Sequence, residues 1–272
     1  MKLQEQLQKF KSEHKAILAT NFYNFETLTA VLLAAKAQDS PLILQLSESS
    51  IKYMGLEVAK AMADSAIKQF GVNAWVHLDH GSDVNLVKQC IDIGFDSVMI
   101  DASEKPFEEN IEITKEIVAY AKPHGINVEA ELGYIAKLGQ DQDMVYTQPE
   151  EAKEFVERTG INALAIAVGS AHGFYSKTPE LQIDLIGQIN AATNAALVLH
   201  GGSGVPNDQI QAAIKQGISK INLATEIKNI FMKSLQEILS STDEIDLRKV
   251  FPKATEQATN LVIAKLQNIN FS

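Results

Sequence analysis

The segment from Trp75 to Gly81 places three titratable side chains at the end of an otherwise apolar run. It reads Trp-Val-His-Leu-Asp-His-Gly, so that His77, Asp79 and His80 fall within four positions. Burying such groups is unfavourable unless each is hydrogen-bonded, paired with a charge or bound to a metal ion. The pattern therefore predicts a strand that ends in a carboxylate and an imidazole that act in catalysis or metal binding.

Two more histidines, His172 and His200, also end strand-like runs, and each is followed by glycine. A single histidine at such a place is most often a core or capping residue, but three at equivalent strand ends favour a metal. Catalytic zinc is held by three protein ligands with a fourth position open. We therefore predict a divalent metal site, zinc foremost, on His80, His172 and His200, with Asp79 as the acid beside it. His77 is expected to support this site by a hydrogen bond.

Short apolar runs alternate with amphipathic segments eight times along the chain. The strand-like runs cover residues 16–23, 41–47, 74–81, 97–103, 127–133, 163–169, 196–202 and 220–225. Helical periodicity covers residues 26–38, 57–70, 84–93, 107–122, 150–159, 184–192 and 208–216. Runs that are apolar throughout are typical of parallel strands buried on both faces. Eight such units predict an α/β protein, a (β/α)8 TIM barrel.

The barrel is predicted to occupy residues 1–272 as a single domain, because the composition shows no linker. Residues 226–269 are helical with a polar break at 240–246, so they supply the eighth helix and at least one extra C-terminal helix. In such barrels the active site lies at the carboxyl ends of the strands. Polar residues gather at this end in all eight units: Asn21, Ser47, Asp79, Asp101, Glu131, His172, His200 and Asn222.

A glycine-rich turn, residues 200–204 (His-Gly-Gly-Ser-Gly), follows the seventh strand-like run. Barrels often bind phosphate in the loops after strands seven and eight, through backbone N–H groups and a helix N-terminus. The turn could also be a tight connection that needs glycine for its geometry. The adjoining His200 and the matching loop at residues 222–225 favour phosphate.

The composition argues against several classes of function. The net charge of −10 argues against a surface that binds nucleic acid. Cys90 is the only cysteine, so an intrachain disulfide cannot form and a reducing, cytoplasmic location is expected. No apolar run approaches about 20 residues, so no membrane span is expected. The start of the chain reads as an amphipathic helix and not as a signal peptide.

Five short motifs in this order resemble the signatures of the class II, zinc-dependent ketose-bisphosphate aldolases, the fructose- and tagatose-bisphosphate type. They lie at residues 77–81 (HLDHG), 129–133 (EAELG), 171–173 (AHG), 199–204 (LHGGSG) and 220–226 (KINLATE). The stretches 171–179 and 224–228 look closer to the tagatose-bisphosphate branch. The resemblance spans nearly the whole chain. It implies reversible cleavage of a ketohexose 1,6-bisphosphate to dihydroxyacetone phosphate and glyceraldehyde 3-phosphate.

The resemblance also implies a role for each residue at the reacting centre. Zinc on the three histidines would act as a Lewis acid that stabilises an enediolate. Asp79 would protonate the aldehyde oxygen in condensation and take that proton back in cleavage. Asn222 would hydrogen-bond the enediolate. Asp101 and Glu131 match the family's accessory metal positions.

Substrate binding is implied at several loops of the same end. The residues that would bind substrate are Asn21, Ser47, Gly173, Gly201, Gly202, Ser203, Ala224 and Thr225. The phosphate of the dihydroxyacetone half would lie on Gly173, Gly202, Ser203 and Thr225. Ser47 would hold the other phosphate. Backbone carbonyls near Ala171, Gly173 and Gly201 match the family's site for a monovalent cation, sodium or potassium.

One loop departs from the family's pattern. Members usually carry a glycine pair and a Glu-Asp step shortly after the fifth strand, and that glutamate abstracts the proton at carbon. Residues 134–143 contain no glutamate, and Asp141 is the best replacement. Its carboxylate is one methylene shorter, a difference that a mobile loop could absorb. The alternatives are an altered aldolase, or a non-catalytic barrel that binds metal and a phosphorylated ligand.

Two competing chemistries fit the sequence less well. A Schiff-base aldolase needs a lysine inside the barrel, and we expect none there, because Lys220 stands at the amino end of its run. Metal-dependent barrel hydrolases usually place a His-x-His pair on the first strand, and residues 16–23 have none. Apolar positions of the C-terminal helices indicate a homodimer or homotetramer, and a phosphorylated sugar is the expected small-molecule partner.

Overall fold

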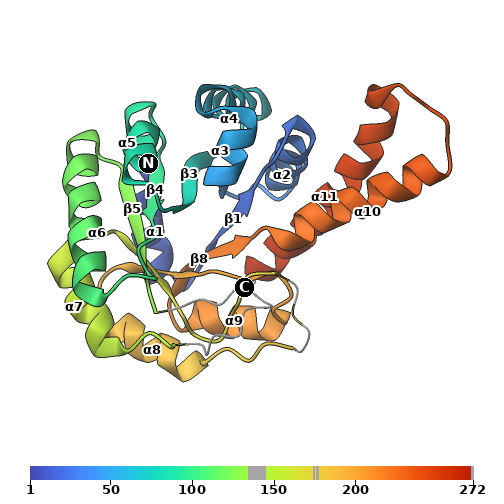
Figure 1. Cartoon of the computed structure of the whole chain (residues 1–272). Helices are drawn as coiled ribbons and strands as arrows, with labels where there is room; N and C mark the ends of the chain where they lie inside the picture. Colours follow the sequence, from blue (N-terminus) through green and yellow to red (C-terminus); the bar gives the residue numbers. More distant parts are fainter. Residues whose placement is uncertain (134–144, 174, 176–177, 271–272) are drawn as a thin grey trace.

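The computed structural model describes residues 1–133, 145–173, 175 and 178–270. Within these residues, eight parallel strands close into a barrel in sequence order, with β1 paired to β8. The strands are β1 (Ile17–Asn21), β2 (Leu42–Ser47), β3 (Ala74–Gly81), β4 (Ser97–Ile100), β5 (Asn127–Leu132), β6 (Ala163–Ile166), β7 (Ala196–Leu199) and β8 (Ile218–Leu223). Helices alternate with them and lie outside the barrel (Figure 1). The predicted (β/α)8 barrel is confirmed.

The helices of the described residues follow the predicted order. They are α1 (Leu3–Ser12), α2 (Phe25–Ala37), α3 (Glu48–Met54), α4 (Leu56–Phe70), α5 (Val84–Asp92), α6 (Phe107–Ala121), the 3-10 turn η1 (Lys122–His124), α7 (Pro149–Thr159), α8 (Ile183–Ala192), α9 (Asn207–Lys215), α10 (Thr225–Ser240) and α11 (Leu247–Ile269). Helical periodicity in the sequence predicted no helix at the position of α3. This helix has only seven residues, too few for a clear period, and Gly55 at φ +85° separates it from α4.

Alternation along the strands sorts their side chains into an outward and an inward set. The outward set joins the large apolar cluster beneath the helices. At the amino end of the barrel the inward set is apolar, as Ile17, Ile43 and Trp75 show, and Leu3 and Leu7 of α1 close this end. The inward residues become polar toward the carboxyl ends. The fold therefore places Asp79 and His80, the sixth and seventh residues of β3, at the carboxyl end of the barrel.

The two C-terminal helices extend away from the barrel as a pair, and α11 also packs on α2 (Figure 1). α10 ends at Ser240 and α11 begins at Leu247, which confirms the predicted polar break and the extra C-terminal helix. Asp246 caps α11, because its Oδ1 accepts a hydrogen bond from the backbone N–H of Arg248 at 3.0 Å. Among the described helices, none is long and apolar enough to cross a bilayer.

Candidate active site and metal centre

The three histidines predicted from the sequence come together at the carboxyl end of the barrel. One ring nitrogen from each of His80, His172 and His200 lies within 4.8 Å of the other two. Nε2 of His80 and Nδ1 of His200 are 2.9 Å apart. Zinc–nitrogen bonds are about 2.0–2.1 Å long, so small side-chain adjustments would bring all three nitrogens onto one ion.

The second nitrogen of two of these rings is held by a carboxylate. Nδ1 of His80 lies 2.7 Å from Oδ2 of Asp101, and Nε2 of His200 lies 2.9 Å from Oε1 of Glu129. Histidines that bind metal commonly donate their other N–H to a carboxylate, which fixes the tautomer and the ring orientation. The donor set and its support therefore fit a divalent metal.

The charges around the rings also suit a cation. Burial lowers the pKa of His80, but Asp79, the hydrogen bond with Asp101, and Glu131 outweigh burial and raise this pKa to about 9. His80, Asp101 and Glu131 form a second group of possible metal ligands, and one ligand atom from each lies within 4.8 Å of the other two. Burial raises the pKa of Asp101, yet its contacts with His80 and Ser103 hold that pKa below its usual value. Carboxylates thus surround the imidazoles and favour a positive ion between them.

The carboxylate of Asp79 lies beside the metal centre and is held by side-chain amides. Oδ2 accepts a hydrogen bond from Asn21 at 2.9 Å, and Oδ1 accepts one from Gln45 at 3.0 Å and one from Asn222 at 3.3 Å. Burial raises the pKa of Asp79, but His80 and other positive groups and the Asn21 hydrogen bond lower it below its usual value overall. The acid is therefore ionised and fixed at neutral pH.

A small cavity of about 40 Å³ collects most of the predicted site. It is lined by Asn21, Asp79, His80, His172, Gly173, Gly201, Ser203, Asn222, Ala224 and Thr225. The hydroxyl of Ser203 is buried there and has no hydrogen-bond partner among the described residues. Two of the predicted metal ligands, the acid and residues of the loops after β6, β7 and β8 thus line one cavity, and Nδ1 of the third ligand, His200, lies 2.9 Å from Nε2 of His80.

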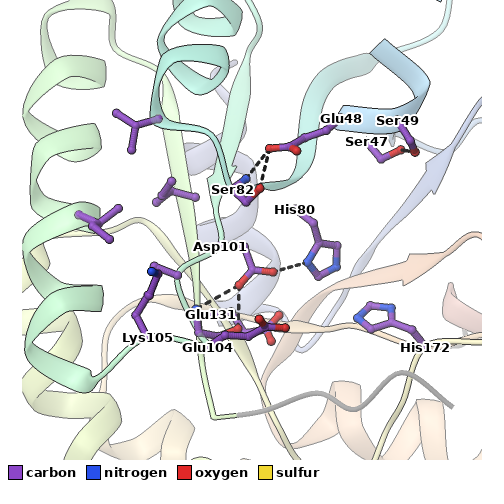
Figure 2. Close-up of a pocket in the computed structure, with 15 residues that line it drawn as sticks. Ser47, Glu48, Ser49, His80, Ser82, Asp101, Glu104, Lys105, Glu131 and His172 are labelled. Carbon is purple, nitrogen blue, oxygen red and sulfur yellow. Dashed lines mark hydrogen bonds and ion pairs between the residues drawn. The ribbon is translucent and has the colours of Figure 1, made fainter. Parts of the chain in front are cut away.

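Two predicted substrate residues lie outside the small cavity. Ser47 lines a larger adjoining cavity of about 630 Å³, which we call the outer cavity and which shares His80 and His172 with the small one. Figure 2 shows Asp101 bonded to His80 within the outer cavity. Gly202 lines neither cavity, because it packs against β8 and a Cβ there would meet a methyl group of Ile221 at 2.9 Å. Asp141 lies outside the described residues.

Sequence reasoning missed several residues that contact the site. Gln45 holds Asp79, and its one signal was a polar residue within an apolar strand. Tyr175 joins two site loops, because its hydroxyl accepts a hydrogen bond from the Ala171 N–H at 2.7 Å and donates to the Gly201 carbonyl at 2.8 Å. Glu129 belongs to the second motif of the sequence but was given no role there, and the structure shows that it supports His200.

The expectation about lysine is wrong. Lys220 is the third residue of β8, its side chain is 1% exposed, and it lies within the barrel. Its Nζ donates to Oε2 of Glu129 at 2.7 Å and lies 3.3 Å from Nε2 of His77. This amine is engaged with a carboxylate in the interior, which does not suit a Schiff-base nucleophile. His77 contacts Lys220 and Ser97 and belongs to this interior network.

The fold and the site together define a metal-dependent barrel enzyme. The sequence profile of the family described as "Fructose-bisphosphate aldolase class-II" matches residues 1–272. Fructose-bisphosphate aldolase of Geobacillus stearothermophilus is 42% identical over 261 residues, covering 93% of this chain and 90% of that protein. The corresponding protein of Staphylococcus epidermidis is 39% identical over 279 residues, covering 99% and 97%.

Solved structures agree with these relatives. The YdjI aldolase from Escherichia coli K12 aligns with a TM-score of 0.87 and 31% identity, covering 99% of this chain and 97% of that one. A putative fructose-1,6-bisphosphate aldolase from Coccidioides immitis aligns with a TM-score of 0.90 and 31% identity, covering 99% and 96%. The chain therefore belongs to the class II fructose-bisphosphate aldolase family.

Family membership settles the class of chemistry. The protein is a carbon–carbon lyase that catalyses a reversible aldol cleavage, and the family implies a divalent metal and a phosphorylated sugar substrate. The hydrolase and the non-catalytic barrel gain no support from any of these relatives.

Proposed function

We propose that this enzyme cleaves a ketohexose 1,6-bisphosphate into dihydroxyacetone phosphate and glyceraldehyde 3-phosphate, with zinc on His80, His172 and His200. The observation that carries the proposal is the small cavity, which is lined by His80, His172, the Asp79 carboxylate and a glycine-rich loop, with Nδ1 of His200 2.9 Å from Nε2 of His80. Fructose bisphosphate is the substrate in the names of relatives 42% and 39% identical. These names favour fructose bisphosphate as the substrate. The motif at residues 171–179, in contrast, looks closer to the tagatose-bisphosphate branch.

Asp79 moves the hydroxyl proton in this proposal. Its lowered pKa keeps it ionised, so it accepts the proton of the substrate hydroxyl during cleavage and returns it during condensation. Asn21 and Gln45 hold the carboxylate in place for both steps. A bound zinc ion supplies Lewis-acid stabilisation of the charge that develops on the substrate oxygen.

The loops after β6, β7 and β8 bind the phosphate of the dihydroxyacetone half. The free Ser203 hydroxyl in the small cavity supports this assignment, and Gly173 and Thr225 line the same cavity. Asn222 lines the same cavity and orients the enediolate oxygens. Ser47, in the outer cavity, binds the second phosphate, which lies farther from the metal.

Three further roles rest on the resemblance. Asp141 is the base that abstracts the proton at carbon. Asp101 and Glu131 offer a second metal position beside His80, as their ligand atoms allow. The carbonyls near Ala171 and Gly201 hold a sodium or potassium ion.

Assembly and location complete the proposal. We propose a homodimer or homotetramer, supported by apolar side chains that remain exposed along α2 and α11, Phe25 at 51% and Leu247 at 60%. A cytoplasmic location is supported by the single, buried cysteine, Cys90.

The test measures triose release from fructose 1,6-bisphosphate and from tagatose 1,6-bisphosphate side by side. The zinc-loaded protein, the chelator-stripped protein and the protein restored with zinc are compared. We expect cleavage that stripping abolishes, that zinc restores and that borohydride leaves untouched. Release of inorganic phosphate without trioses, or full activity after all metal is removed, would contradict the proposal.

A further inference from the structure

A buried chain of charged and polar groups runs from β8 through β5 to the metal centre. Lys220 on β8 donates to Oε2 of Glu129 on β5 at 2.7 Å. The other oxygen of the same carboxylate, Oε1, lies 2.9 Å from Nε2 of His200. The three side chains are at most 1% exposed. One carboxylate therefore connects an interior lysine to a proposed zinc ligand.

The geometry assigns different tasks to the two nitrogens of His200. Because Nε2 faces an anionic oxygen, it carries the proton, and Nδ1 presents its lone pair toward Nε2 of His80, 2.9 Å away. The tautomer that can bind a metal through Nδ1 is thus set by Glu129. A carboxylate in this role needs a counter-charge, because an unpaired anion is strongly unfavourable in the interior.

Lys220 provides that counter-charge, and its own surroundings hold it in place. Nζ also lies 3.3 Å from Nε2 of His77, whose Nδ1 lies 2.7 Å from Oγ of Ser97. Asn127 donates to the same hydroxyl at 2.8 Å. His77 therefore gives the ammonium group a second contact, besides the one with Glu129.

We propose that Lys220 is a positioning residue of the metal centre: through Glu129 it fixes the tautomer and orientation of His200 and so raises the affinity of the site for zinc. This inference rests on the proposed zinc site. It is independent of which sugar is cleaved. In this inference Lys220 has a positioning role, and no Schiff base forms on its amine.

The test measures metal affinity, not turnover. Lys220→Met keeps the length of the side chain and removes its charge, and Glu129→Gln removes the charge that Lys220 pairs with. Dissociation constants for Zn²⁺ come from competition with a chelator, and the visible absorption of bound Co²⁺ reports the geometry at the histidines. We expect each variant to bind Zn²⁺ about 10- to 100-fold more weakly and to shift the Co²⁺ spectrum.

The double variant Lys220→Met/Glu129→Gln shows whether Lys220 acts through Glu129. It leaves no unpaired charge in the interior, so we expect it to fold even if Lys220→Met alone does not. We expect its Zn²⁺ affinity to equal that of Glu129→Gln. Lys60→Met is the matched control, since Lys60 is 8% exposed and ion-paired with Asp64 away from the histidines. It should leave Zn²⁺ affinity and the Co²⁺ spectrum unchanged.

The outcomes separate this inference from the proposed reaction. Folded Lys220→Met or double-variant protein that binds Zn²⁺ as tightly as the unaltered chain would overturn the inference. An unaltered chain that binds no Zn²⁺ would overturn it as well, together with the zinc site. Weakened Zn²⁺ binding in the variants supports the inference even if the unaltered chain cleaves neither bisphosphate, a result that would count only against the proposed substrate.

Discussion

Oδ1 of Asp79 lies 4.0 Å from Nε2 of His80, although a regular strand would turn these adjacent side chains to opposite faces. The pairing of β3 with β4 shifts register between Leu78 and Gly81, and His80 takes a φ of +51°. Such a bulge re-aims one side chain. The irregularity therefore places the proposed acid and a proposed zinc ligand beside each other in one cavity.

Replacing the acid should remove proton transfer and leave the metal. In Asp79→Ala we expect kcat to fall by about 10²- to 10⁴-fold, the usual contribution of a positioned acid or base. The zinc content should stay at the level of the unaltered protein, because Asp79 is not a ligand in the proposed site. Initial rates and zinc analysis of the purified protein check both statements. A variant that loses its zinc along with its activity would instead make Asp79 part of the metal site.

Much of this arrangement follows from the sequence because a parallel barrel brings its strand ends together. Once eight runs are recognised, residues at the carboxyl ends must converge whatever their separation in the chain. His80, His172 and His200 could therefore be grouped, and the structure brings their nitrogens within 4.8 Å. The bulge that turns Asp79 and His80 to the same side leaves no comparable signal in residue types.

Contacts between side chains deep in the barrel could not be predicted from the sequence in this way. The pairing of Lys220 with Glu129 joins residues 91 positions apart. It depends on how β5 and β8 face each other across the closed barrel, which local patterns do not determine. Ser47 also ends its strand as expected, yet it lines the outer cavity beside the small one.

Removal of one proposed ligand should weaken metal binding. In His172→Ala we expect the zinc dissociation constant to rise well over tenfold, a loss of more than about 1.4 kcal/mol. His124→Ala is the matched control, because His124 is an exposed histidine of η1. Zinc retained after dialysis against a chelator measures the difference. Equal retention in the two variants would exclude His172 as a ligand.

Gln45 should contribute to activity by holding Asp79. In Gln45→Leu the 3.0 Å hydrogen bond to Oδ1 is lost, while those from Asn21 and Asn222 remain. Hydrogen bonds to charged groups contribute about 1.5–3 kcal/mol, so we expect kcat to fall about 10- to 100-fold. KM should change little, because Gln45 lines neither the small cavity nor the outer one. Steady-state kinetics test this split, and a rise in KM with kcat unchanged would mean that Gln45 contacts the substrate instead.

Gly201 should be required for close contact between two site loops, and Gly71 offers a control with nearly the same backbone. Gly201 has φ +65° and Gly71 has φ +67°, so alanine costs about 1–2 kcal/mol of backbone strain at either position. A Cβ on Gly71 would meet no atom within 4 Å, whereas one on Gly201 would collide with the Ala171 carbonyl, next to His172. Gly71→Ala should therefore lower the melting temperature by a few degrees, at about 2–4 °C per kcal/mol, and keep full activity. Gly201→Ala should lower it further and lose most activity, because the loop that carries His172 must move. Thermal unfolding and kcat/KM of the two variants give the comparison, and equal activities would show that the β6 and β7 loops tolerate separation.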